Sequence, residues 1–341
     1  MPNPLRIGLA GFGRLAREYY LPAFRTLPDA RLVAVADPLG ESRANAQRRM
    51  PSLAVFPDHA EMLDRASLDA LLVASPPSTH LPIWNAAAAR GLPVFMEKPF
   101  VLCGQLPEIA RGHATAKLML DFNRRFWPTY RRAGELIQRG VLGSPVEVDF
   151  RLHTDVFSWS TVTRHRFSRD EGGILHDLGG HAIDLAAILL GEEPETVTAR
   201  ISDARRSGDQ LLLELAFADG SVVRCDLAWG DRTSERLAVA GPQGRLSLAD
   251  PNMAIRLARN GTHGPRIADD LRDLAIFGYR VLRRSHTMSR FSIRCALAAF
   301  VRAIRQGEPF SPGFEDAVRN VRWLEAAARS AAEGKPAPRP A

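Results

Sequence analysis

The stretch Arg6-Ile7-Gly8-Leu9-Ala10-Gly11-Phe12-Gly13-Arg14-Leu15-Ala16 predicts a strand, a tight glycine turn and a helix in succession. Gly11 and Gly13 supply the backbone freedom that lets a pyrophosphate rest on amides at the N-terminus of a helix. Ala16 is small enough for the helix to pack closely on the strand. The pattern is weak evidence when it stands alone, and it predicts a dinucleotide-binding turn if a parallel sheet follows.

Asp37 ends the next apolar run, residues 32–36, which is typical of a strand covered by helices on both faces. It lies about twenty residues past the glycines, where a carboxylate accepts a hydrogen bond from the ribose 2′-OH and repels a 2′-phosphate. We therefore expect NAD as the cofactor, with NADP as the alternative because Arg43 lies one to two helical turns further on. The competing interpretation of Asp37 is a helix cap before Glu41.

Strand and helix patterns continue to alternate after Asp37. Strands are predicted near residues 53–56, 69–75, 92–96 and 116–122, and helices near 40–49, 58–66, 78–90 and 104–112. Such alternation predicts a doubly wound parallel sheet of the Rossmann type, whose ligands bind at the carboxyl ends of the strands. Two of these ends are Ser75-Pro76-Pro77-Ser78-Thr79-His80 and Met96-Glu97-Lys98-Pro99, which we expect at the same edge as the glycine turn.

Lys98 is unusual because only three of the 45 lysine and arginine residues are lysines, the others being Lys117 and Lys335. Arginine keeps its proton at any accessible pH, whereas a desolvated lysine can release and retake one. A lysine retained at the end of a strand therefore indicates a need for a titratable amine. The alternative is a surface lysine without a chemical role.

The segment 172–190 carries a second group of polar residues. Asp177 and His181 are four residues apart and Asp184 is three further on, so all three share one face if the segment is helical. An imidazole beside a carboxylate is suited to relay the proton of a hydroxyl when hydride leaves a carbinol carbon. The alternatives are a metal site from Asp177, His181, Asp184 and His176, and a purely structural His181. We predict no metal.

Period-two patterns from residue 146 to 240 predict antiparallel strands, after a helix that begins at Pro128 and ends near Gly140. The uncovered face of such a sheet commonly meets another subunit, so we expect a homodimer or homotetramer. Residues 155–170, with Trp159 and Arg164, are irregular and predict a loop that covers the substrate. Helices over residues 291–306 and 314–332 are expected to pack back on the protein.

Taken together, these motifs resemble the oxidoreductases that include glucose-fructose oxidoreductase and inositol 2-dehydrogenase, the Gfo/Idh/MocA family. The resemblance covers most of the chain, through the glycine turn, residues 75–80, Glu97-Lys98-Pro99, residues 123–126 and residues 172–184. It implies a nicotinamide-binding Rossmann domain, residues 1–122, and an α+β domain with a large, mostly antiparallel sheet for substrate and oligomerisation, residues 123–335. The catalytic lysine of the family falls on Lys98, its acid/base histidine on His181 and an auxiliary aspartate on Asp177.

The same resemblance implies redox chemistry on a sugar, a cyclitol or a related polyol. The expected cofactor-binding residues lie in the turns already described, namely Gly11, Phe12, Gly13, Arg14, Leu15, Asp37, Ser75, Pro76, Pro77, His80, Glu97 and Lys98. The expected substrate-binding residues lie at the domain boundary and in the irregular segment, namely Asn123, Arg125, Trp159 and Arg164.

Composition excludes several other classes of protein. The net charge of +7 is spread along the 341 residues, and the arginines of residues 265–290 lack interleaved aromatics, so we expect no nucleic-acid partner. The three cysteines form no CxxC motif, and no long apolar span predicts a membrane segment, so we expect a cytoplasmic protein. A dehydrogenase is the expected function. The alternatives are a non-catalytic nicotinamide sensor and a relative that uses the cofactor transiently to cleave glycosides.

Overall fold

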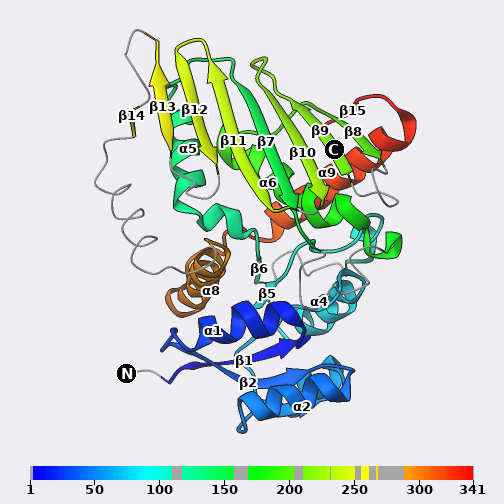
Figure 1. Cartoon of the computed structure of the whole chain (residues 1–341). Helices are drawn as coiled ribbons and strands as arrows, with labels where there is room; N and C mark the ends of the chain where they lie inside the picture. The colour runs from blue at the N-terminus through cyan, green and yellow to red at the C-terminus, as the bar shows by residue number, and fades with distance from the viewer. Residues whose placement is uncertain are drawn as a thin grey trace. The chain divides into compact units, whose positions relative to one another are not determined.

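The computed structural model describes residues 3–109, 117–156, 168–202, 210–230, 232–249, 255–260, 266–267 and 288–340. The chain forms two compact units (Figure 1). Unit 1 combines Met1–Asn123 with Met288–Val321, and unit 2 combines Arg124–Thr287 with Arg322–Ala341. Unit 1 therefore contains a segment from the C-terminal part of the sequence.

Unit 1 is built on a parallel sheet, which has six strands among the described residues. In sequence order the strands are β1 (Leu5–Ala10), β2 (Ala30–Ala36), β3 (Ala54–Phe56), β4 (Ala70–Val73), β5 (Val94–Met96) and β6 (Leu118–Leu120). Their spatial order is β3-β2-β1-β4-β5-β6, and every neighbouring pair is parallel. This is the strand order of a doubly wound dinucleotide-binding sheet, so the predicted fold of this part is confirmed.

Helices connect these strands at nearly the predicted positions. They are the π-helical segment η1 (Ala16–Tyr20) with α1 (Leu21–Phe24), α2 (Gly40–Arg49), α3 (His59–Arg65), and η2 (Pro77–Thr79) with α4 (His80–Ala88). Helix α8 (Met288–Gln306) comes from the C-terminal part of the sequence and also belongs to unit 1. Helix α9 (Phe314–Glu333) begins in unit 1 and continues into unit 2. Of the predicted helix over 104–112, residues 104–109 form the 3-10 turn η3 (Leu106–Glu108), which ends because Ile109 is extended, and residues 110–112 lie outside the described residues.

The core of unit 1 lies on both faces of the parallel sheet. Strand β4 is buried at all four positions, as expected for a strand covered by helices on both sides. Trp84 of α4 makes an edge contact with Phe100 and stacks on Phe314, with ring centroids 5.3 and 5.9 Å apart. The start of α9 is therefore part of the core that supports the carboxyl ends of β4 and β5.

Unit 2 is built on a mostly antiparallel sheet, which has nine strands in the part of the chain that the structure describes. The strands are β7 (Glu147–Thr154), β8 (Thr196–Ser202), β9 (Gln210–Ala216), β10 (Val222–Trp229), β11 (Ser234–Gly241), β12 (Gly244–Ala249), β13 (Arg256–Arg259), β14 (Arg266–Ile267) and β15 (Ala337–Pro338). Their order is β14-β13-β12-β11-β7-β10-β9-β8-β15. Only β7 and β10 pair in parallel, so the predicted second sheet is confirmed.

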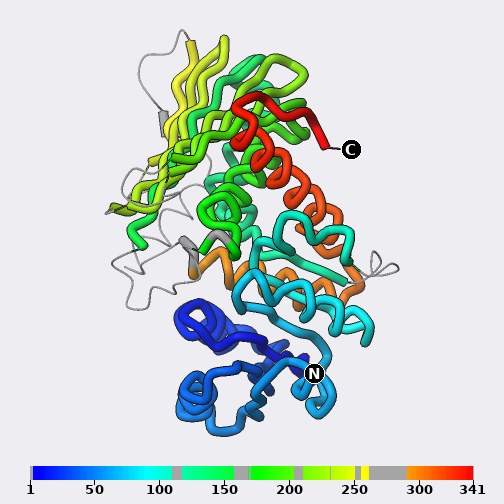
Figure 2. The backbone as a smooth tube through the Cα atoms, turned by 90° about the vertical axis from the view of Figure 1, so that its right-hand side faces the viewer, coloured from blue at the N-terminus to red at the C-terminus, as the bar shows by residue number. Residues whose placement is uncertain are grey.

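Among the described residues, helices cover one face of this sheet and none covers the other (Figures 1 and 2). Helix α5 (Pro128–Gln138), which follows the short helix η5 (Asn123–Phe126), packs on α6 (Gly180–Leu190). The segment η8 (Leu175–Gly179), which follows the short helix η7 (Arg169–Glu171), leads directly into α6 and contacts β9 and β10. Strand β7 shows the alternation, because Val148, Phe150 and Leu152 are buried whereas Glu147 and Asp149 are exposed. No helix among the described residues is long and apolar enough to cross a lipid bilayer.

Candidate active site in two halves

The glycine turn after β1 is held close to the ends of β2 and β4. Gly11 has a φ of 92°, and a Cβ atom at this position would lie 2.7 Å from the carbonyl oxygen of Ala74. Its amide donates a 2.8 Å hydrogen bond to the carbonyl of Ala36. A Cβ atom at Gly13 would instead meet no atom within 4 Å. Glycine is therefore required at position 11 for the fold, while the space at Gly13 can admit a ligand close to the backbone.

Asp37 fixes the same turn through both of its carboxylate oxygens. Asp37 Oδ2 accepts a 2.7 Å hydrogen bond from the amide of Phe12, and Oδ1 accepts a 2.9 Å bond from the amide of Leu39. Helix α2 has Leu39 as its N-cap residue and no side-chain cap, so Asp37 is not the N-cap of that helix. Arg43 donates to the backbone carbonyls of Asp37 and Pro38 at 2.7 and 2.9 Å, which holds a cation beside this carboxylate.

His80 joins the turns that follow β4 and β5. Its Nδ1 atom lies 2.7 Å from the carbonyl oxygen of Pro99, and its Nε2 atom lies 3.0 Å from that of Ser75. The imidazole is fully buried, so it braces the two turns from inside unit 1. Lys98 lies in the second of these turns, directly after β5, and is half-buried. These contacts bring the predicted residues of the Ser75–His80 and Glu97–Pro99 turns together at one edge of the sheet.

In unit 2, Asp177 lies in the π-helical segment η8, and His181 and Asp184 lie in α6. Asp177 Oδ2 accepts a 2.9 Å hydrogen bond from the indole Nε1 of Trp229, at the end of β10. Asp184 instead forms an ion pair with Arg125, whose two nitrogens approach its carboxylate at 2.6 to 3.1 Å. His181 and Asp184 are buried, with 9% and 5% of their surface exposed. Asp177 and Asp184 therefore have different partners, although one continuous helical segment carries them.

A metal site in unit 2 receives no support from this arrangement. Among the residues that the structure describes, no group of three or more His, Cys, Asp or Glu side chains could hold a metal ion. His176 is buried and its Nδ1 lies 3.1 Å from the carbonyl oxygen of Gly172, which has a φ of 83°. His176 therefore braces the glycine turn that precedes the helix.

Arg124 belongs to a further buried cluster, which was not predicted from the sequence. Its Nε atom donates to Glu235 Oε1 at 2.8 Å, and Tyr130 donates to the same oxygen at 2.8 Å. Burial by itself lowers the pKa of the Arg124 guanidinium, but Glu235, Tyr130 and Asp177 together raise the pKa above its ordinary value. The guanidinium therefore stays charged near Asp177. Glu235 is 111 residues away in sequence, and no local pattern marks it.

Of the four predicted substrate residues, two lie in the described part of the chain and two lie outside it. Asn123 begins the short helix η5, and Arg125 is engaged by Asp184 as described. Trp159 and Arg164 lie outside the described residues. Substrate contacts of all four residues stay predictions.

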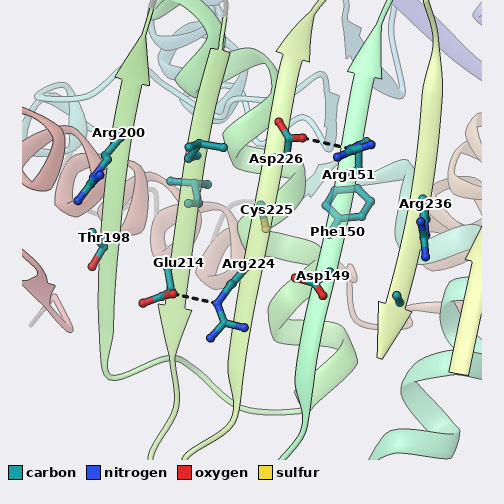
Figure 3. Close-up of a pocket in the computed structure, with 13 residues that line it drawn as sticks. Asp149, Phe150, Arg151, Thr198, Arg200, Glu214, Arg224, Cys225, Asp226 and Arg236 are labelled. Carbon is teal, nitrogen blue, oxygen red and sulfur yellow. Dashed lines mark hydrogen bonds and ion pairs between the residues drawn. The ribbon is translucent and has the colours of Figure 1, made fainter. Parts of the chain in front are cut away.

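The open face of the second sheet carries a concave region of about 580 Å³ (Figure 3). Its lining is mainly charged and comes from β7, β8, β9, β10 and β11, with Arg224 bonded to Glu214 and Arg151 bonded to Asp226. Asp177 and His181 belong to the helical layer on the opposite face. This hollow is therefore a feature of the open face and separate from the candidate active-site residues.

Comparison with known proteins identifies the protein family that contains both parts of the chain. Residues 5–119 match the model of the oxidoreductase family with an NAD-binding Rossmann fold, and residues 134–338 match the C-terminal α/β domain of the same family. The chain belongs to the Gfo/Idh/MocA family of oxidoreductases, and it is an NAD-dependent dehydrogenase of that family.

Individual relatives are dehydrogenases of sugars and cyclitols. The chain is 26% identical to inositol 2-dehydrogenase of Rhizobium meliloti, with 96% of this chain and 97% of that protein covered. It is 28% identical to D-apiose dehydrogenase of Paraburkholderia graminis, with 96% and 88% covered. The solved structure of levoglucosan dehydrogenase with NADH and levoglucosan has a TM-score of 0.84 at 22% identity, covering 99% of this chain and 100% of that one. This last likeness shows a shared fold.

The residues of unit 1 fit the nicotinamide cofactor of the family. The backbone at Gly13 has open space beside it, and the Gly11 turn is fixed by β2 and β4. The carboxylate of Asp37 stands at the end of β2, where a dinucleotide ribose binds in this fold. Pyrophosphate would be held at the turn and ribose beside Asp37.

Proposed function

We propose that this enzyme oxidises a secondary hydroxyl of a sugar, a cyclitol or a related polyol, with Lys98 and His181 as acid/base groups. The observation that carries the proposal is the position of Lys98, which follows β5 in a turn that His80 ties to the end of β4. Ligands of doubly wound sheets bind at this edge. The names of the relatives by sequence, which include an inositol dehydrogenase and an apiose dehydrogenase, support the class of substrate.

His181 is the group that we assign to the proton of the substrate hydroxyl. An imidazole changes protonation state near neutral pH and can accept that proton as hydride leaves the carbon. When bound, NAD⁺ supplies the acceptor for the hydride. Asp177, whose Oδ2 is held by Trp229, is positioned within the same helical segment and supports the protonated imidazole. Trp229 is therefore a positioning residue for Asp177.

Lys98 is the second group that we assign to proton transfer. A primary amine can exchange a proton, which the guanidinium of arginine cannot do in this pH range. The proposal requires Lys98 and His181 to act on one substrate although they belong to different units. Replacing both Lys98 and His181 should then reduce kcat by much less than the product of the two single reductions, because the effects of groups that act in one step are not additive.

The test is a panel of polyols and sugars mixed with the protein and NAD⁺ or NADP⁺, followed by the absorbance of the reduced nicotinamide. We expect NADH formation with at least one cyclitol or sugar, and a loss of about 10² to 10⁴ in kcat for His181→Ala with little change in NAD affinity. His59→Ala, in α3 of unit 1, is the matched control. Binding of NAD⁺ without turnover on every member of the panel would contradict the proposal and favour a sensor.

We further propose that copies of the chain meet through the open face of the second sheet to give a homodimer or homotetramer. Leu212 is 43% exposed there, among side chains of both charges that include Arg224, Glu214 and Asp226. Such a mixed face can be complementary to a second copy of itself. Arg224→Glu should reduce the mass measured by light scattering to that of a monomer, while Arg48→Glu on α2 should not. A monomeric wild-type protein would contradict this proposal.

We also propose the cytoplasm as the compartment of the enzyme. Cys103, Cys225 and Cys295 are isolated in the sequence and form no CxxC motif or disulfide framework, a usage typical of proteins in a reducing compartment.

A further inference from the structure

Tyr20 is fully buried in unit 1, and its hydroxyl contacts two carboxyl groups. The Tyr20 Oη atom lies 2.6 Å from Glu97 Oε1 and 2.7 Å from Asp121 Oδ2. Tyr20 and Asp121 have no exposed surface, and Glu97 has 8%. Both distances are typical of a short hydrogen bond between a hydroxyl group and a carboxylate. Residues from η1 and from the ends of β5 and β6 therefore form one buried polar cluster.

The number of protons in this cluster follows from its geometry. A tyrosine hydroxyl carries one hydrogen, and an ionised carboxyl group carries none. If both carboxyl groups were ionised, one short contact would bring two oxygen atoms together without a hydrogen between them and away from water. A second proton removes this repulsion, because one acid can then donate to Tyr20 while Tyr20 donates to the other carboxylate. One of the two carboxyl groups is therefore neutral.

Asp121 is the better candidate for the neutral acid. Its Oδ1 atom is buried without a hydrogen-bond partner, which would be costly for an ionised group. Burial raises the pKa of Asp121 well above its ordinary value and the charge of Glu97 raises it further, against the opposing effects of Tyr20 and Lys98. Burial likewise raises the pKa of Tyr20, so the hydroxyl keeps its own proton. Glu97 is partly exposed and precedes Lys98, which suits it to be the ionised partner.

We propose that Asp121 is a neutral acid in the folded protein and that it fixes Glu97 through the hydroxyl of Tyr20, so that Tyr20 and Asp121 are positioning residues for the turn that carries Lys98. Asp121 Oδ2–H donates to Tyr20 Oη, and Tyr20 Oη–H donates to Glu97 Oε1. The titratable groups that face Asp121 are Tyr20 from η1 and Glu97 and Lys98 from the turn after β5.

The consequence for Lys98 is electrostatic. An ionised Asp121 would add a negative charge near the amine and would favour its protonated form. A neutral Asp121 adds none, and the hydrogen bond from Tyr20 limits how closely the Glu97 carboxylate can approach the amine. The cluster thereby keeps one negative charge away from the amine of Lys98. This role rests on the proposed function of Lys98, whereas the protonation state of Asp121 does not.

The protonation state is tested by NMR of the protein labelled with ¹³C at the aspartate carboxyl carbons. We expect one carboxyl resonance to keep the chemical shift of a neutral acid at about pH 5 and above, beyond the ordinary titration range of aspartate. That resonance should vanish in Asp121→Asn and remain in Asp64→Asn, the exposed control. Titration of every aspartate below about pH 5 would overturn the proposal.

The effect on Lys98 is tested without substrate or cofactor. Reductive methylation with ¹³C-formaldehyde labels the three lysines, and Lys98→Arg assigns the signal of position 98. Asp121→Asn replaces a neutral acid with a neutral amide, so the titration midpoint of the Lys98 signal should move by less than about 0.3 pH unit. Tyr20→Phe frees the Glu97 carboxylate and should raise that midpoint by about one pH unit.

Two results would overturn the positioning role. A midpoint that falls by about half a unit or more in Asp121→Asn would show that Asp121 is ionised beside the amine. An unchanged midpoint in Tyr20→Phe, in a protein whose circular dichroism matches the wild type, would show that the cluster does not act on Lys98. A wild type that oxidises no polyol but keeps a neutral Asp121 would refute the proposed function alone.

Discussion

Substitution of Asp121 by asparagine should make the protein more stable at neutral pH than the wild type. The amide can donate to Tyr20 Oη in place of the protonated acid, so the hydrogen bonds of the cluster are kept. The unfolded chain releases the Asp121 proton above about pH 3.9, whereas burial raises the pKa of Asp121 in the folded protein well above that value. The wild type must therefore hold a proton in the folded state that the unfolded state has lost.

The sign and size of the effect follow from proton linkage. Because the folded state binds one more proton, the free energy of unfolding falls by about 1.4 kcal/mol for each unit of rising pH, until the folded pKa is reached. Between pH 5 and the folded pKa the wild type should therefore lose stability relative to Asp121→Asn at this slope. Well below the ordinary aspartate pKa of about 3.9 this linkage contribution disappears, since both states of the wild type then carry the proton; at pH 4 it is already small.

Urea unfolding of both proteins at pH 4, 5, 6 and 7 measures this difference, taken from the transition that exposes Asp121. Asp64→Asn controls for the loss of one acidic residue at an exposed site. A difference in unfolding free energy that is the same at every pH would refute the reasoning, because it would mean that Asp121 titrates alike in the folded and unfolded states.

Four further substitutions test the two halves of the candidate site. Gly11→Ala should destabilise unit 1 by about 1 to 3 kcal/mol in urea unfolding, since alanine is strained at a φ of 92°. Gly13→Ala should fold normally, because a methyl group at this position meets no neighbouring atom. It should weaken NAD binding by about tenfold in a fluorescence titration, because the methyl group occupies the space in which we expect the cofactor. Asp37→Ala should narrow the preference for NAD over NADP in the same titration. Equal affinities of the wild type for NAD and NADP would contradict the proposed role of Asp37 in selecting NAD. Arg125→Ala leaves the buried Asp184 carboxylate without its cation and should lower the melting temperature, at a cost of about 3 kcal/mol.

Features that depend on neighbouring residues were predictable from the sequence. The glycine turn, the continuous apolar strands and the carboxylate of Asp37 each follow from residues that lie close together in the chain, and the doubly wound sheet followed from their alternation.

Contacts between distant residues could not be predicted in the same way. The pair of Arg124 and Glu235 and the contact of Tyr20 with Asp121 join residues more than a hundred positions apart. A single charged residue in an alternating strand, as at Glu235, resembles an ordinary solvent-facing position until the fold buries it. The π-helical segment around Asp177 was also missed, because its spacing differs from an α-helix by one residue per turn.

The most direct test of the central claim is the pH dependence of kcat for Lys98→Arg on a polyol that the wild type oxidises, with Lys335→Arg as the control. Arginine keeps the positive charge but cannot release its proton. We predict that Lys98→Arg binds NAD with nearly wild-type affinity and loses about 10² or more in kcat between pH 6 and 10, while Lys335→Arg is unaffected. A Lys98→Arg enzyme with wild-type kcat and an unaltered pH profile would contradict the assignment of Lys98 as an acid/base group.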